Sequence, residues 1–204
     1  MLPSELCVKN LFSPMQDKYF EDETYQKQDY TTSPLTVADY DNCNFINCNF
    51  ANSDLSDLTF SECSFENCDL SNVKLQKTGL KDVQFKGCKL LGLHFHDCEH
   101  FLFQVSFQDC SLNLSSFYKL KLAKTKFINC SLKEIDFAEA DLANAVFTNC
   151  DLANAVFDNT NLEKADLRTA YNFSIDPEKN KIKKARFSVA GLAGLLEKYG
   201  IEVE

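Results

Sequence analysis

A large apolar residue stands at every fifth position over most of this chain. The series runs unbroken from Tyr40 to Phe95, and after one irregularity it resumes at Leu102 and continues to Leu167. Two residues before each of these positions the side chain is small, as at Cys43. A period of five fits neither an α-helix nor a β-strand. It predicts a solenoid, in which each unit buries its apolar face only against its neighbours.

Several five-residue units share the same letters around the large residue. They read Cys-Asn-Phe45, Cys-Asp-Leu70, Ala-Asp-Leu142, Cys-Asp-Leu152 and Ala-Asp-Leu167. Over roughly residues 25–192 the chain resembles the pentapeptide-repeat family, whose consensus is A(D/N)LXX. The resemblance implies an all-β fold: a right-handed quadrilateral β-helix of about eight coils, with four pentapeptides in each coil.

Residues that lie twenty positions apart support this coil length, because they fall into columns of matching type. One column reads Tyr25, Phe45, Phe65, Phe85, Phe107, Phe127, Phe147, Leu167 and Phe187, and the opposite one reads Leu35, Leu55, Leu75, Phe95, Phe117, Phe137 and Phe157. The large residue and the small residue of each unit are expected to face inward. The other three positions are expected to face water.

The pattern divides the chain into three parts. Residues 1–24 show little period and are expected to be irregular, and residues 25–187 form the predicted β-helix, with a register slip at 96–102 and a loop excursion at 168–182. Residues 188–204 predict a short helix with Ser188 as its N-cap, then a strand at Ile201 and Val203.

The predicted helix carries an apolar stripe formed by Val189, Leu192, Leu195, Leu196 and Tyr199. Its ending is similar to the C-terminus of quinolone-resistance (Qnr-type) pentapeptide proteins, and this similarity implies a homodimer of two rods joined end to end. Leu192, Leu195, Leu196 and Tyr199 are the candidate dimer contacts. A monomer with the helix as a simple cap is the alternative.

The register slip holds all three histidines of the chain. Seven residues separate Phe95 from Leu102, so two extra residues are expected to bulge outward, with Leu102 facing inward and Phe101 and Phe103 facing outward. These two phenylalanines are candidate interaction residues. The spacing of His94 and His96, together with Asp97 or Cys98, could also hold Zn²⁺ or Ni²⁺. A purely structural bulge is the third interpretation.

Composition and charge narrow the class of protein. The net charge is −9 and the pI is about 4.9, which opposes direct nucleic-acid binding. No catalytic motif or cofactor motif is present, so we expect a non-enzymatic protein without a cofactor. There is no apolar run long enough for a membrane span, and the ten cysteines fall mostly in small inward columns as free thiols. A cytoplasmic location fits such thiols.

Two functions follow from these observations. The first is a protein-interaction scaffold with an unknown partner. The alternative, implied by the Qnr-type resemblance, is a bacterial DNA mimic that binds DNA gyrase or topoisomerase IV and protects these type II topoisomerases from quinolones. Lysines that interrupt the acidic surface, such as Lys74, Lys77 and Lys119, weigh against the mimic. The projecting loops that Qnr-type proteins use on the topoisomerase are also absent before Leu167.

Overall fold

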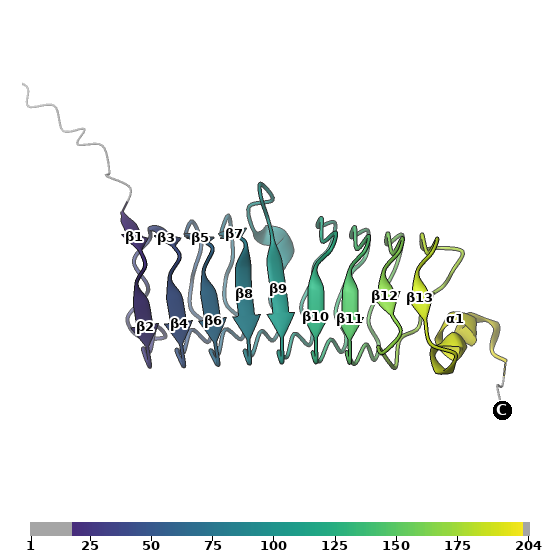
Figure 1. The fold of residues 1–204 in the computed structure, drawn as a ribbon. Coiled ribbons are helices and arrows are strands. Elements are labelled where there is room, and N and C mark those ends of the chain that lie inside the picture. The colour runs from purple at the N-terminus through teal and green to yellow at the C-terminus, as the bar shows by residue number, and fades with distance from the viewer. Residues whose placement is uncertain (1–17, 202–204) are drawn as a thin grey trace, which may run out of the picture.

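The computed structural model describes residues 18–201 as one parallel β-solenoid of about eight turns with a short helical segment at its C-terminal end (Figure 1). The predicted all-β class and quadrilateral β-helix are confirmed. Residues 1–17 of the expected irregular segment, and Val203 of the expected terminal strand, lie outside the described residues.

Two parallel sheets run along the rod. One sheet has four short strands, which are β1 (Tyr19–Glu21), β3 (Asp39–Asp41), β5 (Thr59–Ser61) and β7 (Gly79–Lys81). The other has nine strands, which are β2 (Thr24–Gln26), β4 (Asn44–Ile46), β6 (Ser64–Glu66), β8 (Val83–Lys86), β9 (Val105–Gln108), β10 (Lys126–Ile128), β11 (Val146–Thr148), β12 (Asp166–Leu167) and β13 (Arg186–Phe187). Isolated parallel bridges extend the pairing to the remaining faces.

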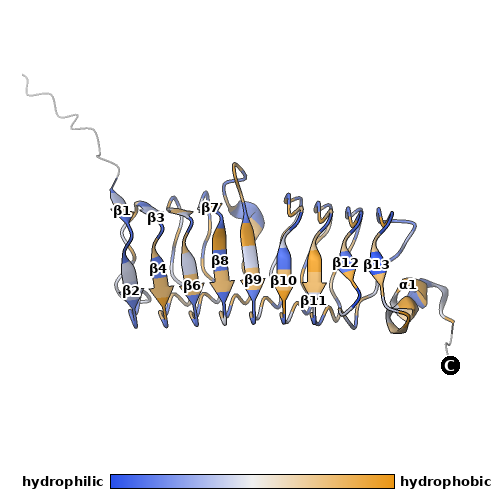
Figure 2. Ribbon diagram, in the orientation of Figure 1, coloured by the Kyte–Doolittle hydropathy of each residue, from blue (hydrophilic) through white to orange (hydrophobic). Residues whose placement is uncertain are grey.

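Outside the register slip, residues that pair between neighbouring coils are twenty positions apart, which is the coil length that the sequence columns predict. Phe45 pairs with Tyr25 below and Phe65 above, and Phe127 pairs with Phe147, always twenty residues apart. Along the strands the residues alternate between buried and exposed, which appears as alternating hydropathy in Figure 2. Each strand therefore contributes its large residue to the interior.

Stacked aromatic rings fill that interior. In the column from Tyr25 to Phe147, neighbouring ring centroids lie 4.7–5.4 Å apart with nearly parallel planes. The opposite column continues the same way from Phe95 to Phe157. Rings of the two columns meet edge to face, as between Phe107 and Phe117 at 5.9 Å. Such arrangements add to the area that the rings bury.

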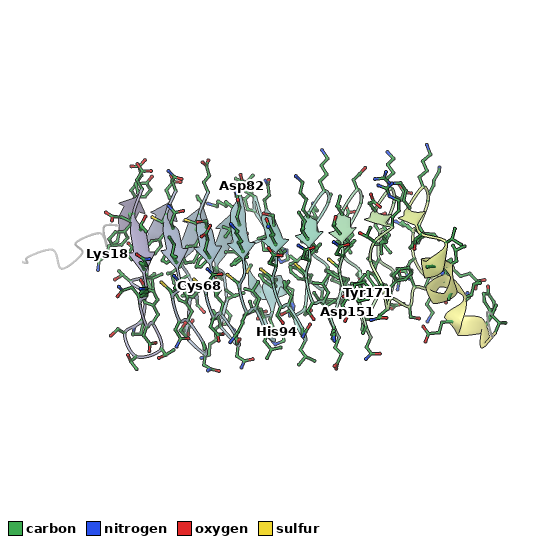
Figure 3. All side chains as sticks on the ribbon, turned by 60° about the horizontal axis from the view of Figure 1, so that its bottom comes forward. Lys18, Cys68, Asp82, His94, Asp151 and Tyr171 are labelled. Atoms are coloured by element: carbon green, nitrogen blue, oxygen red, sulfur yellow. The ribbon has the colours of Figure 1, made fainter. Side chains whose placement is uncertain are left out.

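The small inward positions hold thiols. The nine cysteines among residues 18–201 are all free and buried. Cys68 lies within the solenoid body, whereas Asp82 points away from it (Figure 3). The thiol of Cys68 donates to the carbonyl oxygen of Phe45 one coil below, at 3.3 Å, and Cys88 and Cys150 repeat this contact. Burial raises the pKa of Cys63 to about 12, so that thiol stays protonated at neutral pH.

Each corner of a coil is turned by a residue in the left-handed region. Positive φ values of about 50–65° recur every five residues, often at asparagine, as at Asn47, Asn67 and Asn129. Where glycine replaces asparagine at Gly87, a Cβ atom would overlap the side-chain oxygen of Asn67 in the coil below. The left-handed backbone conformation therefore recurs at the corners, whichever residue occupies them.

The solenoid begins earlier than expected. Strand β1 lies within residues 1–24, and Phe20 pairs with Tyr40 and stacks on its ring at 5.2 Å. The five-residue register therefore extends back to Phe20. Exposed neighbours such as Glu21, Asp22 and Glu23 hide that register, because the first coil has solvent on one side.

A short helical segment closes the other end. It consists of η2 (Ala190–Leu192), α1 (Ala193–Leu196) and η3 (Glu197–Tyr199), and Ser188 Oγ accepts a hydrogen bond from the amide of Gly191, as predicted for an N-cap. Gly200 ends it at φ +60°. Ile201 forms no strand, contrary to prediction, because the chain has already left the last coil.

The excursion expected at 168–182 anchors this tail. It buries Phe173 and Ile175, and the amide of Ile175 donates to the carbonyl of Gly194 at 2.9 Å. A methyl group on Gly194 would overlap the carbonyl oxygen of Phe173, so the close packing requires glycine. Lys198 Nζ adds ion pairs with Asp176 at 2.7 Å and Glu178 at 2.8 Å.

None of the helices in the described part of the chain has both the length and the apolarity to cross a membrane.

The stacked core generates a direct test of the register. Phe107 is buried between Phe85 and Phe127, while its neighbour Gln108 points to solvent. Phe107→Ala should lower the free energy of unfolding by about 3–5 kcal/mol, because a cavity replaces the ring. Gln108→Ala should change it by less than about 0.5 kcal/mol. Urea denaturation followed by circular dichroism measures both, and equal losses would contradict the register.

Candidate interaction surface

Two extra residues interrupt the rod at its middle, as the sequence predicts. Gly79 pairs with Glu99, twenty residues on, but Val83 pairs with Val105, twenty-two residues on. The additional length lies in residues 100–104, which we call the bulge. It projects from the solenoid just before β9 (Figure 1).

The side chains of the bulge differ from the prediction at two positions. Leu102 was expected to face inward, but it is 63% exposed, at the tip of a turn with φ +59°. Phe103 was expected to face outward, but it is partly buried against the core. Phe101 is 69% exposed, as expected. The inserted residues form a separate turn, so the phase of the five-residue pattern does not apply inside it.

The candidate metal ligands are not brought together. Cys98 faces the interior, and burial raises the pKa of its thiol. The rings of His94 and His96 lie 5.3 Å apart at nearly right angles, and His96 Nε2 is 3.8 Å from Asp97 Oδ1. In residues 18–201 no group of three or more His, Cys, Asp or Glu side chains is arranged to hold a metal ion.

The segment instead has structural contacts. His94 pairs with Ser116 of the next coil, and residues Phe95–Asp97 form the 3₁₀ turn η1. The carbonyl of His96 lies 3.1 Å from His100 Nε2, which ties the start of the bulge to this turn. His96 Nδ1 is buried without a hydrogen-bond partner in the described structure.

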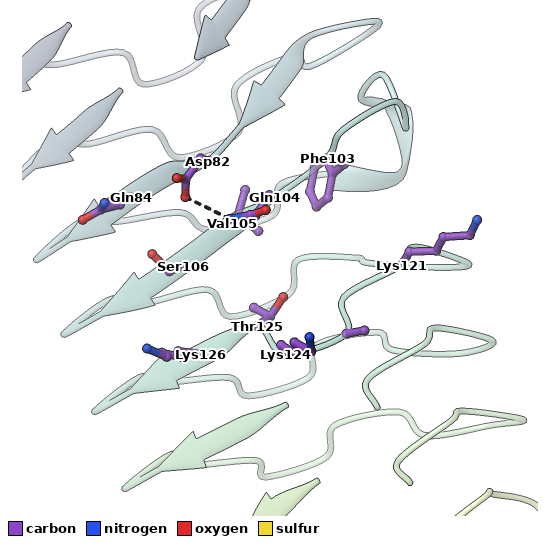
Figure 4. A pocket seen from close by; sticks show the side chains of 11 residues that line it. Asp82, Gln84, Phe103, Gln104, Val105, Ser106, Lys121, Lys124, Thr125 and Lys126 are labelled. Carbon is purple, nitrogen blue, oxygen red and sulfur yellow. Dashed lines mark hydrogen bonds between the residues drawn. The ribbon is translucent and has the colours of Figure 1, made fainter. Parts of the chain in front are cut away.

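A groove of about 470 Å³ runs beside the bulge on its C-terminal side (Figure 4). Its walls are Phe103 and Val105 on one side and the side chains of Lys121, Lys124 and Lys126 on the other. Gln104 Nε2 donates to Asp82 Oδ1 at 3.1 Å at its edge. A second hollow, of about 380 Å³, lies between the bulge and Glu62 on the N-terminal side. The bulge therefore stands between two grooves.

Ion pairs between coils place lysines beside carboxylates on other parts of the surface. Lysines face carboxylates about one coil away in the pairs Lys74–Asp54, Lys86–Glu66, Lys89–Asp69, Lys119–Glu139 and Lys133–Asp151, with separations of 3.2–4.0 Å. Exposed pairs like these contribute little to stability. They do turn the faces that carry them into a patchwork of charge.

At the C-terminal end, the predicted dimer contacts are divided between packing and exposure. Leu195 is partly buried against the core, and Leu196 is 36% exposed. Leu192 and Tyr199 are about half exposed, and Tyr199 donates a hydrogen bond to Glu178. Val189 is 87% exposed. The tail caps the rod and still presents apolar side chains to solvent.

Sequence reasoning missed the groove. Lys121, Lys124 and Lys126 looked like interruptions of an acidic surface, whereas the structure gathers them at one edge beside the bulge. The signal was available in the sequence, since residues one coil apart share a face. To use this signal, one must first locate the bulge, because the coil that contains it is twenty-two residues long instead of twenty.

Comparisons with known proteins agree with this fold. The family profile described as "Pentapeptide repeat region" matches residues 33–117 and 58–137, and "Pentapeptide repeats (8 copies)" matches residues 135–170. The chain belongs to the pentapeptide-repeat family. No curated protein matches its sequence.

Two solved structures of this family illustrate the likeness. Full-length QnrB1, described as a plasmid-mediated fluoroquinolone resistance protein, is similar at a TM-score of 0.54 and 16% identity, covering 90% of this chain and 100% of that one. HetL, described as involved in heterocyst differentiation regulation in the cyanobacterium Nostoc sp. strain PCC 7120, is similar at 0.55 and 15%, covering 84% and 87%. Identities this low establish the fold alone.

The histidine geometry predicts the outcome of metal addition. Because Cys98 faces the core, Zn²⁺ or Ni²⁺ should leave the melting temperature of the folded protein unchanged, since only an ion that binds the native state raises it. Differential scanning calorimetry with and without metal measures this. A rise that disappears in His94→Ala/His96→Ala would establish a metal site here.

Proposed function

We propose that the chain is a non-enzymatic scaffold that binds a protein partner through the bulge and its two grooves. The observation that carries the proposal is the pair of exposed apolar side chains Phe101 and Leu102 at the middle of a rigid rod. Large apolar side chains of this kind serve as anchors in protein interfaces when a pocket on the partner takes them. The solenoid supplies fixed support, because residues on both sides of the bulge are held in parallel pairing.

A protein partner fits the surface better than nucleic acid does. The net charge of −9 repels phosphates at long range. Near the bulge, Glu62 and Asp82 lie on one side and Lys121 and Lys124 on the other, so the surface carries both signs. A reducing cytoplasm is the compartment that suits the buried free thiols of this scaffold.

We also propose that two copies join end to end through the C-terminal tail. Val189, Leu192 and Tyr199 remain exposed at the end of the rod, where α1 lies (Figure 1). A two-fold axis at this end would let the same patch cover itself. The monomeric cap is the competing arrangement.

The topoisomerase alternative has weaker support. A DNA mimic needs a continuous negative stripe, and the pairs Lys74–Asp54, Lys89–Asp69 and Lys119–Glu139 break the acidic surface at successive coils. A supercoiling assay with purified gyrase and a quinolone tests it directly. Protection of the enzyme by this protein would favour the mimic over the scaffold.

The bulge generates a mutational prediction. Phe101→Asp/Leu102→Asp should weaken the captured partner's binding roughly tenfold or more, because charged groups would replace two apolar anchors. Both positions are exposed, so the melting temperature should not change. Affinity capture from the native cell, quantified by mass spectrometry against the unmodified protein, provides the measurement.

The matched control is Leu114→Asp/Val156→Asp. Leu114 is an exposed leucine at another corner with φ +62°, close to the +59° of Leu102, and Val156 is also exposed. This variant has the same charge as the bulge variant. Equal binding by both variants would show that the bulge is not the binding surface.

The tail generates a separate prediction. Val189→Asp/Leu192→Asp should convert an end-to-end dimer to monomers, since unpaired charges would enter the contact. Val37→Asp, exposed near the opposite end, should leave the dimer intact. Sedimentation velocity at tens of micromolar shows whether each variant is a dimer or a monomer. An unmodified protein that is monomeric under these conditions would leave the tail as a cap.

A further inference from the structure

One corner of the solenoid carries a regular column of exposed polar residues, which we call the corner column. Its members have positive φ and stand one coil apart, except that the coil with the bulge separates Asp82 from Lys124. They are Asp22, Asn42, Glu62, Asp82, Lys124, Asn144, Lys164 and Lys184. The amide of each residue from Lys124 to Lys164 donates to the coil above, as those of Asp22, Asn42 and Glu62 do. The bulge lies between Asp82 and Lys124.

The charges of this column change sign at the bulge. Every charged member on the N-terminal side is acidic, and every charged member on the C-terminal side is basic. Neighbouring positions repeat the division, with Glu21, Asp39 and Asp41 in what we call the acidic half, and Lys121, Lys126, Lys181, Lys183 and Arg186 in the basic half. Lys81 in the acidic half, and Asp141, Glu163 and Asp166 in the basic half, are the local exceptions.

These charges are available to a partner. In the described part of the chain, Lys124, Lys164 and Lys184 form no ion pair within 4.0 Å, unlike Lys74, Lys86, Lys89, Lys119 and Lys133 on the other faces. Glu62 and Asp82 likewise have no cationic partner there, and Asp82 accepts only the neutral amide of Gln104. Arg186 pairs with Asp166 one coil away at 2.8 Å, but the charged residues of the corner column itself are not cancelled by a neighbouring coil.

We propose that this face pairs with a second copy of the chain, antiparallel, about a two-fold axis at the bulge. The inference rests on the proposed function and names the partner of that surface. A perpendicular two-fold axis places each coil on one side of the bulge against the equivalent coil on the other side. Asp82 then faces Lys124 of the second copy, and Asp22 faces its Lys184. Because of the two-fold symmetry, each of these charge pairs occurs twice in the contact.

The bulge and the groove make the centre of this contact self-complementary. The groove adjoins the bulge on its C-terminal side and is lined in part by Phe103 and Gln104 of the bulge. With the axis at the bulge, Phe101 and Leu102 of each copy lie beside the groove of the other and can enter it. Val105, Ala123 and the aliphatic stems of Lys121 and Lys124 give the groove apolar walls. The exposed apolar residues are thus covered at the point where the charges change sign.

The size of the face sets the expected strength. Eight coils at about 4.8 Å and a face about 12 Å wide give on the order of 500 Å² from each copy. The total of about 1,000 Å² is at the lower limit for a specific interface. The dimer should therefore be weak and sensitive to salt, with dissociation increasing several-fold between about 0.05 M and about 0.5 M NaCl.

Nucleic acid is a poorer match for this face. A phosphate backbone placed along the corner column would meet the basic half favourably but would be repelled by Glu62, Asp82 and Asp22. A second copy provides both signs in the required order. A uniformly acidic protein is also a poorer match than a second copy, because it would pair with the basic half and leave the acidic half unpaired.

Two charge-reversed variants test the proposal. Lys124→Glu/Lys184→Glu places acid against acid at the two proposed contacts of the corner column, and Asp22→Lys/Asp82→Lys places base against base there. Each variant alone should lose the side-by-side dimer, whereas an equimolar mixture should restore it as a heterodimer. Glutamate and lysine already occupy such corners at Glu134 and Lys77, so both variants should fold. Lys27→Glu/Lys77→Glu, at other corners, is the charge-matched control and should still dimerise.

Sedimentation velocity gives the mass, and small-angle scattering gives the shape. A side-by-side dimer has a maximum dimension close to that of one rod, whereas an end-to-end dimer is about twice as long. A mixture of the two variants that forms no side-by-side dimer, or a side-by-side dimer unaffected by either variant, would overturn the proposal. If the mixture fails while Phe101→Asp/Leu102→Asp still loses a captured partner, the scaffold function stands and its partner is another protein.

Discussion

Parallel backbone hydrogen bonding between successive coils is the constraint on which the rest of this structure depends. It places each residue directly over the one twenty positions earlier, so any side chain repeated at that interval becomes a continuous row. Rings stack on rings from Tyr25 to Phe147, thiols lie over thiols from Cys48 to Cys150, and charges line up along the corner column. The interior and the binding surfaces are therefore both consequences of a single register.

The same constraint explains why a two-residue insertion has a large effect. The parallel pairing resumes at Val105 without a shift of phase between inward and outward positions, because the extra residues leave the coil entirely. Their backbone cannot join the ladder, and their apolar side chains have no row to join. Phe101 and Leu102 are consequently presented to solvent, while the coils above and below remain intact.

The sequence predicts the orientation of residues that follow the five-residue repeat. It does not predict the orientation of residues outside that repeat. Phe107 and Phe127 could be placed in one buried column because each repeat reports on its neighbours. Leu102 and Phe103 could not, because a turn outside the coil follows local backbone geometry rather than the five-residue period. The register of Phe20 was hidden by acidic neighbours. To predict the lysine-lined groove, residues forty-two positions apart, such as Asp82 and Lys124, must be assigned to one corner across the two inserted residues.

The left-handed corners have a further consequence for how this chain tolerates change. A residue other than glycine, asparagine or aspartate pays about 1 kcal/mol of steric strain in that conformation. Lys124, Lys164 and Lys184 all adopt it, although asparagine fills the equivalent position at Asn42 and Asn144. Stability alone would therefore favour asparagine along the whole corner. Lysine nevertheless occupies these three corners. Replacing it with asparagine would relieve the strain and stabilise the protein, with the loss of the positive charge.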